Sequence, residues 1–93
     1  MSGETRVHAI VEGVVQGVGY RYFALGEARS RGLTGWVRNR ADGSVEVLVE
    51  GREGLVRDFV RQLHIGPPSS RVTAVNVQRE TFAGDMDSFA VRH

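Results

Sequence analysis

The 93-residue sequence contains no cysteine and no lysine, because all twelve of its basic residues are arginine. Without cysteine, the chain can form no disulfide, thiolate zinc site, iron–sulfur cluster or thiol nucleophile. Without lysine, it can form neither a Schiff base nor the lysine contact of a Walker A loop. The three histidines, His8, His64 and His93, lie far apart in the sequence. We therefore expect no metal site and no cofactor.

Long hydrophobic runs and a strong charge of either sign are missing as well. No apolar run approaches the roughly 18–20 residues of a membrane span, and the short polar start does not resemble a signal peptide. Twelve arginines against eleven acidic residues give a net charge of +1, and the arginines are scattered among carboxylates. Nucleic-acid-binding proteins usually show a larger basic excess. These features predict one domain over residues 1–93, cytoplasmic and monomeric, with no nucleic-acid or membrane partner.

Hydrophobic periodicity and turn signals predict five strands and two helices. Alternating apolar residues favour strands at residues 6–13, 35–40, 44–50, 71–78 and 88–92. Apolar residues at helical spacing favour helices at residues 21–31 and 52–64. The order is β-α-β-β-α-β with a short fifth strand. It predicts an α+β, ferredoxin-like sandwich in which an antiparallel sheet carries both helices on one face.

Individual side chains carry expectations of their own. The first helix is expected to pack through a face formed by Tyr22, Leu25 and Ala28, and Trp36 is interpreted as a packing residue. His8 alternates with apolar neighbours and is expected to be exposed. Glu53 and Arg57 are four residues apart on the second helix, a spacing that favours an ion pair.

The most informative segment is glycine-rich and runs from a strand into a helix. Gly17 and Gly19 let backbone N–H groups converge at a helix N-terminus, and Arg21 adds a planar fork that can bind two phosphate oxygens. The spacing fits neither a dinucleotide-binding fingerprint, which would need a small residue at Tyr22, nor a thiol phosphatase loop, which would need cysteine at Val15. The alternative is a plain turn with a surface arginine. If the segment is catalytic, water must attack directly.

Asn39 is the second candidate, since it lies near the end of a predicted strand just before the Asp42-Gly43 turn. A carboxamide is a poor nucleophile and base, but it can position a water molecule with one acceptor and two donors. The alternative is that Asn39 simply caps the hairpin turn, as asparagine often does.

Two long motifs resemble the signatures of the acylphosphatase family. The first is Val11-Glu12-Gly13-Val14-Val15-Gln16-Gly17-Val18-Gly19-Tyr20-Arg21, and the second is Gly35-Trp36-Val37-Arg38-Asn39 followed by Gly43, Val45 and Gly51. The segment Gly66-Pro67-Pro68-Ser69-Ser70-Arg71-Val72 also resembles the family's link between the second helix and the next strand. Two departures are Tyr20, where the family more often has phenylalanine, and Arg40, which is bulkier than the small polar residue common after the asparagine.

The resemblance implies a metal-independent hydrolase whose partners are a small acyl phosphate and inorganic phosphate. It implies that Arg21 and the backbone N–H groups of a phosphate-binding loop hold the phosphoryl group, and that Asn39 orients the attacking water. The loop residues concerned are Val15, Gln16, Gly17, Val18, Gly19 and Tyr20.

A binding or regulatory module without significant activity is the alternative. RNA-recognition domains share the β-α-β-β-α-β order, and the segment at residues 19–23 faintly resembles their aromatic motif. That motif belongs on an interior strand, where its aromatic rings stack on bases. Here the segment lies at a helix start, and the predicted strand at residues 44–50 carries two glutamates and no aromatic residue.

Overall fold

The computed structural model of the chain describes residues 3–93. Its elements are β1 (Glu4–Val14), α1 (Tyr20–Ser30), β2 (Thr34–Asn39), β3 (Val45–Arg52), α2 (Glu53–Ile65), β4 (Arg71–Glu80) and β5 (Phe89–Arg92). All seven predicted elements are therefore present, and their bounds differ from the predicted ones by at most two residues at either end.

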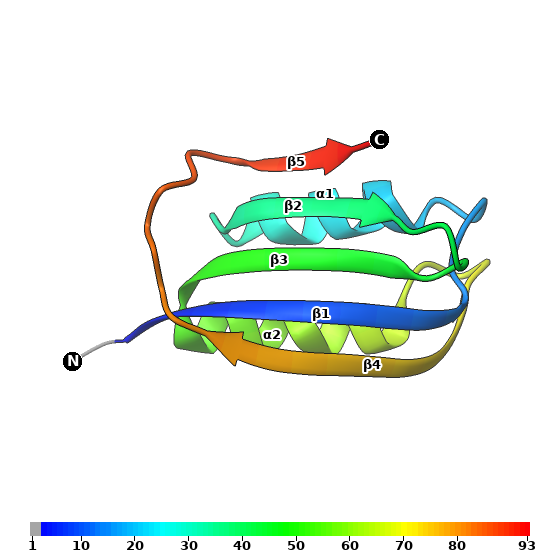
Figure 1. Cartoon of the computed structure of the whole chain (residues 1–93), viewed down its shortest axis with the longest axis horizontal. Helices are drawn as coiled ribbons and strands as arrows, with labels where there is room; N and C mark the ends of the chain where they lie inside the picture. The colour runs from blue at the N-terminus through cyan, green and yellow to red at the C-terminus, as the bar shows by residue number, and fades with distance from the viewer. Residues whose placement is uncertain (1–2) are drawn as a thin grey trace.

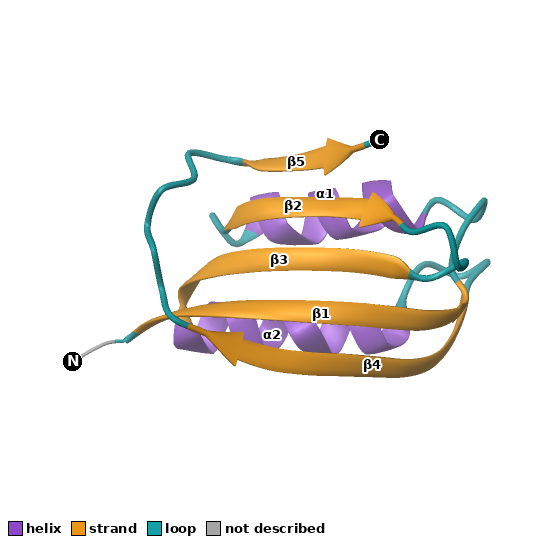
Figure 2. Cartoon of the chain, viewed as in Figure 1, coloured by secondary structure: helices purple, strands orange, loops and turns teal. Residues whose placement is uncertain are grey.

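The five strands form one sheet in the order β4-β1-β3-β2-β5. β1, β2, β3 and β4 pair antiparallel, and β5 adds to the outer edge of β2 in a parallel orientation. Both helices lie on the same side of the sheet, behind it in Figure 1, and Figure 2 shows the two layers by colour. The ferredoxin-like α+β fold is confirmed. The parallel pairing of β5 makes the sheet mixed.

The core lies between the two layers because alternate residues of the central strands point toward the helices. Val7, Ala9 and Val11 of β1 pair directly with Val49, Val47 and Val45 of β3, and all six are buried. α2 covers them with Val56, Phe59 and Leu63, and α1 contributes Tyr20, Ala24 and Ala28.

The expected packing face of α1 is confirmed for Ala28 and in part for Leu25, which packs against the core, but it is wrong for Tyr22. The helix buries Tyr20, Ala24 and Ala28, whereas the side chain of Tyr22 is 64% exposed. The buried face follows a strict spacing of four residues that begins at Tyr20, one position before the predicted helix start. Tyr22 therefore lies roughly 200° around the helix from Tyr20 and cannot share its face.

Two further side chains on the sheet have contacts that the sequence did not specify. Trp36 is only half-buried on the open face of the sheet, where the guanidinium carbons of Arg38 and Arg92 lie 5.2 and 4.8 Å from its ring centroid. His8 is half-buried rather than exposed, and its Nε2 lies 2.6 Å from a carboxylate oxygen of Glu46. These contacts depend on which strands are neighbours, and local sequence does not encode that order.

The predicted ion pair between Glu53 and Arg57 is replaced by one between Glu53 and Arg79 of β4. The two layers bring these residues together although 26 positions separate them in the chain.

Several connections meet at one end of the sheet, on the right in Figure 1. They are the loop after β1, the β2–β3 turn, the α2–β4 connection and the end of β5. This convergence places the two signature motifs beside each other.

Candidate active site

The β1–α1 loop owes its shape to glycines with positive φ angles. Gly17 has a φ of 74° and Gly19 a φ of 80°, in the left-handed region that other residues rarely adopt. Gly19 is the N-cap of α1, and no side chain caps the helix. The first N–H groups of an α-helix have no intrahelical partner. The loop therefore leads directly into a helix N-terminus whose N–H groups suit an anion.

The Gln16 side chain fixes this loop to the neighbouring hairpin. Its Nε2 donates hydrogen bonds to the backbone carbonyls of Arg40, at 2.7 Å, and Ser44, at 2.8 Å. Val15 anchors the start of the loop from inside because its side chain is buried in the core. Loop and hairpin are thereby held in one arrangement, which sets the position of Asn39 relative to the glycines.

Arg21 lies in the first turn of α1 and contacts the C-terminal end of the chain. Its Nη1 is 3.3 Å from the backbone oxygen of Arg92 and 3.1 Å from Nδ1 of His93. Both contacts use the same nitrogen, although a guanidinium carries five N–H donors. Within residues 3–93, the other donors of Arg21 make no hydrogen bond, so they are available to an anionic ligand.

Asn39 is the last residue of β2, and its side chain does not cap the turn that follows. Asp42 does so: its Oδ1 accepts hydrogen bonds from the backbone N–H of Ser44, at 3.0 Å, and from the Ser44 hydroxyl, at 2.6 Å. These hydrogen bonds from Ser44 lower the pKa of Asp42. The Oδ1 of Asn39 is buried and has no hydrogen-bond partner among the residues that the structure describes.

Residues of both motifs together line one cavity of about 160 Å³. It is lined by Val15, Gly17, Gly19, Tyr20, Arg21, Tyr22 and Asn39. The structure therefore brings together six of the eight predicted site residues, while Gln16 and Val18 do not line the cavity. Arg21 is the only formally charged residue in the lining, so the cavity favours an anion.

Tyr22 belongs to this cavity, although its sequence pattern indicated a core position. Arg92 and His93 were also missed as neighbours of Arg21. The sequence offered one signal for Tyr22, which is its position directly after Arg21. Consecutive residues of a helix point about 100° apart, so both can border the same site. The contribution of β5 could not be found in this way, since it depends on the parallel pairing with β2.

Tyr20 connects the site to α2. Its ring is buried, and its hydroxyl donates a 2.6 Å hydrogen bond to the backbone oxygen of Leu63. Burial raises the pKa of Tyr20 above its ordinary value. The hydroxyl that distinguishes tyrosine from the family's more frequent phenylalanine thus has a partner within the fold.

Comparison with known proteins identifies the family to which this arrangement belongs. The acylphosphatase family model matches residues 7–91, which include both motifs and every residue that lines the cavity. The chain belongs to the acylphosphatase family. It is accordingly an enzyme of the acylphosphatase class, and its reaction is the hydrolysis of acyl phosphates.

Individual acylphosphatases match the chain over most of their length. The chain is 53% identical over 75 residues to an acylphosphatase from Chlorobaculum tepidum, covering 81% of this chain and 82% of that protein. It is 46% identical over 93 residues to one from an Anaeromyxobacter species, covering 100% of both. The crystal structure of acylphosphatase from Bacillus subtilis superposes with a TM-score of 0.93 at 42% identity, covering 96% of this chain and 99% of that one.

Residues 3–93 contain no group of three or more His, Cys, Asp or Glu side chains placed to hold a metal ion. No helix in the same range is long and apolar enough to cross a membrane.

Proposed function

We propose that the chain, acting as one domain, hydrolyses acyl phosphates through a water molecule that Asn39 orients toward a phosphoryl group held by Arg21 and the loop amides. The observation that carries this proposal is the buried Oδ1 of Asn39, which has no partner among residues 3–93. A buried acceptor without a hydrogen bond costs about 1–3 kcal/mol. A water molecule that donates to Oδ1 removes this cost and is at the same time placed beside the cavity that Arg21 lines.

Arg21 and the helix N-terminus supply the positive charge that the reaction needs. In phosphoryl transfer, negative charge is spread over the three equatorial oxygens, so catalysis relies mainly on positioning and electrostatic stabilisation. The unpartnered N–H groups of Arg21 can bind two of these oxygens in a bidentate manner. The backbone N–H groups after Gly17 and Gly19 add further donors at the same end of α1.

The leaving group explains why no general acid is required. An acyl phosphate releases a carboxylate, whose conjugate acid has a pKa of about 4, so it departs at neutral pH without protonation. The water oxygen forms a bond to phosphorus, the bond from phosphorus to the acyl oxygen breaks, and its electron pair stays on the carboxylate. The proton lost by the water passes to a phosphate oxygen.

The direct test measures phosphate release from benzoyl phosphate in water labelled with ¹⁸O. We expect the label in phosphate and not in benzoate, because water attacks phosphorus. We expect slow turnover of p-nitrophenyl phosphate, since a phosphate monoester has a poorer leaving group. A chelator is expected to leave the rate unchanged, because Arg21 and the amides carry the stabilising charge. Label in benzoate, or inactivation by the chelator, would contradict the mechanism.

Two substitutions separate the proposed roles of the site residues. Arg21→Ala is expected to lose both turnover and inhibition by inorganic phosphate, whereas Asn39→Ala is expected to keep phosphate inhibition and lose turnover. Each loss in kcat/KM should be about 100-fold or more, as for the removal of an oxyanion donor. Arg29→Ala is the matched control, because Arg29 is an exposed arginine in the last turn of the same helix. Full activity in Asn39→Ala would exclude the water-positioning role.

A further inference from the structure

A second cavity, of about 260 Å³, lies between α2 and strands β1 and β4. It shares no residue with the active-site cavity. We call it the α2–β4 groove. Its lining consists of Thr5, Val7, Glu53, Val56, Arg57, Val60, Arg61, His64, Val77 and Arg79.

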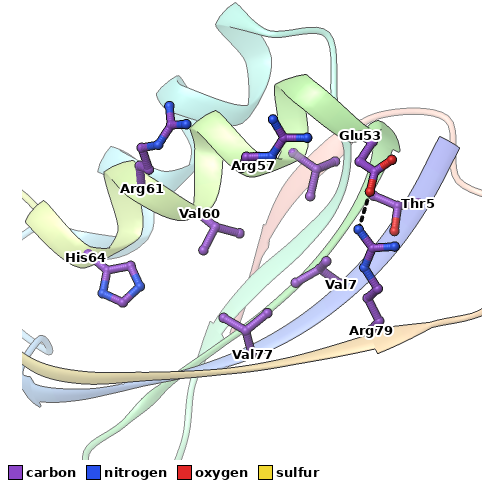
Figure 3. A pocket seen from close by; sticks show the side chains of 10 residues that line it. Thr5, Val7, Glu53, Arg57, Val60, Arg61, His64, Val77 and Arg79 are labelled. Atoms are coloured by element: carbon purple, nitrogen blue, oxygen red, sulfur yellow. Dashed lines mark hydrogen bonds and ion pairs between the residues drawn. The ribbon is translucent and has the colours of Figure 1, made fainter. Parts of the chain in front are cut away.

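The floor of the groove is apolar. In Figure 3, Val60 of α2 points toward Val7 and Val77 on the two strands. Val77 pairs with Ala9 and so lies on the helix-covered face of the sheet, yet its side chain is 47% exposed. α2 packs over the central strands and leaves this part of the outermost strand, β4, uncovered. An apolar surface on the inner side of an edge strand therefore remains open to a ligand.

The rim of the groove is basic. Three arginines and His64 face one carboxylate, Glu53, which is paired with Arg79 at one end, as Figure 3 shows. Arg61 is paired with Asp58 at 2.6 Å. Arg57 forms no ion pair within residues 3–93. His64 lies at the opposite end of the groove from the Glu53–Arg79 pair. An apolar floor with an unpaired cation at its edge complements a molecule that is apolar along its length and negatively charged at one end.

We propose that the α2–β4 groove binds a small amphipathic carboxylate, with its apolar chain over Val60 and Val77 and its carboxylate at Arg57. The volume limits the size of the occupant, since 260 Å³ corresponds to about nine water volumes of ~30 Å³. A short straight-chain fatty acid is therefore the expected occupant, and octanoate serves as the probe. A free carboxylate also fits the charge, because the carboxylate and the guanidinium form a planar bidentate pair.

The test is titration of the ¹⁵N-labelled protein with octanoate, followed by NMR. Inorganic phosphate is kept at saturation throughout, so that the active-site cavity is already filled with its own product. We expect amide shifts that cluster on α2 and β4. Shifts confined to residues 15–21, or no shifts, would overturn the proposal. Because the two cavities share no residue, shifts on α2 and β4 report on the groove whether or not the proposed catalytic mechanism is right.

A chain-length series tests the apolar floor. From butanoate to octanoate, each added methylene should tighten binding about twofold to fourfold, and the gain should stop once the cavity is full. Val77→Thr keeps the side-chain shape and replaces one methyl group with a hydroxyl, so it should weaken octanoate binding severalfold. Affinity that does not depend on chain length would show that the floor takes no part in binding.

A charge comparison tests the rim. Octanoate should bind more tightly than octanol, and Arg57→Gln should weaken octanoate about fivefold while leaving octanol unchanged. Arg29→Gln, on the other helix, is the matched control and should change neither affinity. Equal binding of octanoate and octanol, or an Arg57→Gln variant with unaltered octanoate affinity, would overturn the assignment of an anionic ligand.

Discussion

The hydroxyl of Tyr20, at the start of α1, donates a hydrogen bond to the backbone oxygen of Leu63, near the end of α2. The carbonyl of Leu63 has no intrahelical donor, because the residue four positions later is Pro67, which has no N–H group. A side chain at the start of α1 thus completes the end of the other helix. This contact links the first signature motif to α2.

Replacing Tyr20 with phenylalanine is expected to lower stability and leave catalysis nearly unchanged. The ring stays in place, while the Leu63 carbonyl loses its donor, at a cost of about 1–2 kcal/mol. Urea unfolding measures this change. Tyr22→Phe is the control, because the hydroxyl of Tyr22 makes no hydrogen bond within residues 3–93, and it should cost close to nothing. A Tyr20→Phe variant as stable as the parent would show that the bond contributes no net stability.

The same tyrosine makes a prediction about alkaline pH. Burial raises the pKa of Tyr20 in the folded state above its ordinary value of 10.0. The folded state is therefore favoured below pH 10, and this stability is lost as the pH rises toward the raised pKa. The chain has no lysine and no cysteine, whose titration would otherwise overlap this pH range. Unfolding measured from pH 8 to 11 should show this loss in the parent and less of it in Tyr20→Phe. Equal pH dependence would contradict the assignment.

Gln16→Ala is expected to lower kcat by about tenfold without unfolding the chain. The two hydrogen bonds from Nε2 to the carbonyls of Arg40 and Ser44 hold the loop against the hairpin that carries Asn39. Without them, the loop amides and Asn39 are no longer fixed at one spacing, and small misplacements strongly reduce rates. Gln16→Glu has the same shape but no N–H donor, so it should be equally impaired. Normal kcat in both variants would show that the hairpin positions Asn39 unaided.

Tyr22 is expected to affect the choice of acyl group. Its ring is largely exposed and lines the active-site cavity beside Arg21. An exposed ring at this position can pack against an apolar acyl group, a contact worth about 0.5–1.5 kcal/mol for a pair of aromatic rings. Tyr22→Ala should therefore raise KM for benzoyl phosphate about fivefold and leave KM for acetyl phosphate unchanged, and Tyr22→Phe should restore the parent values. Equal changes for both substrates would exclude this role.

The elements and the loop were predictable from the sequence because their signals are local. Alternation, helical spacing and the glycines around residues 13–19 specify strands, helices and a tight turn without knowledge of the fold. The arrangement of distant parts was not predictable in the same way. The hydrogen bonds of Gln16 to the hairpin, the approach of β5 to Arg21 and the Glu53–Arg79 pair all join residues far apart in the chain. Tyr22 was misplaced because the buried face of α1 contains Tyr20, and two positions along a helix turn a side chain by about 200°.

Glu50→Gln is expected to destabilise the connection between β4 and β5, with a dependence on pH. Burial raises the pKa of Glu50, but hydrogen bonds from the backbone N–H groups of Ala83 and Gly84 and from Arg6 outweigh it, so the net pKa is lowered. The stability that Glu50 contributes is therefore present above its ordinary pKa of 4.5 and is lost as the pH falls through the lowered value. The variant should lose about 2 kcal/mol at pH 7, and the gap to the parent should narrow toward pH 3. Glu80→Gln removes the exposed partner of the same arginine and should cost less than about 1 kcal/mol. Urea unfolding measures the stability difference between variant and parent. An equal difference at pH 7 and pH 3 would contradict a stabilising role of the ionised Glu50 carboxylate.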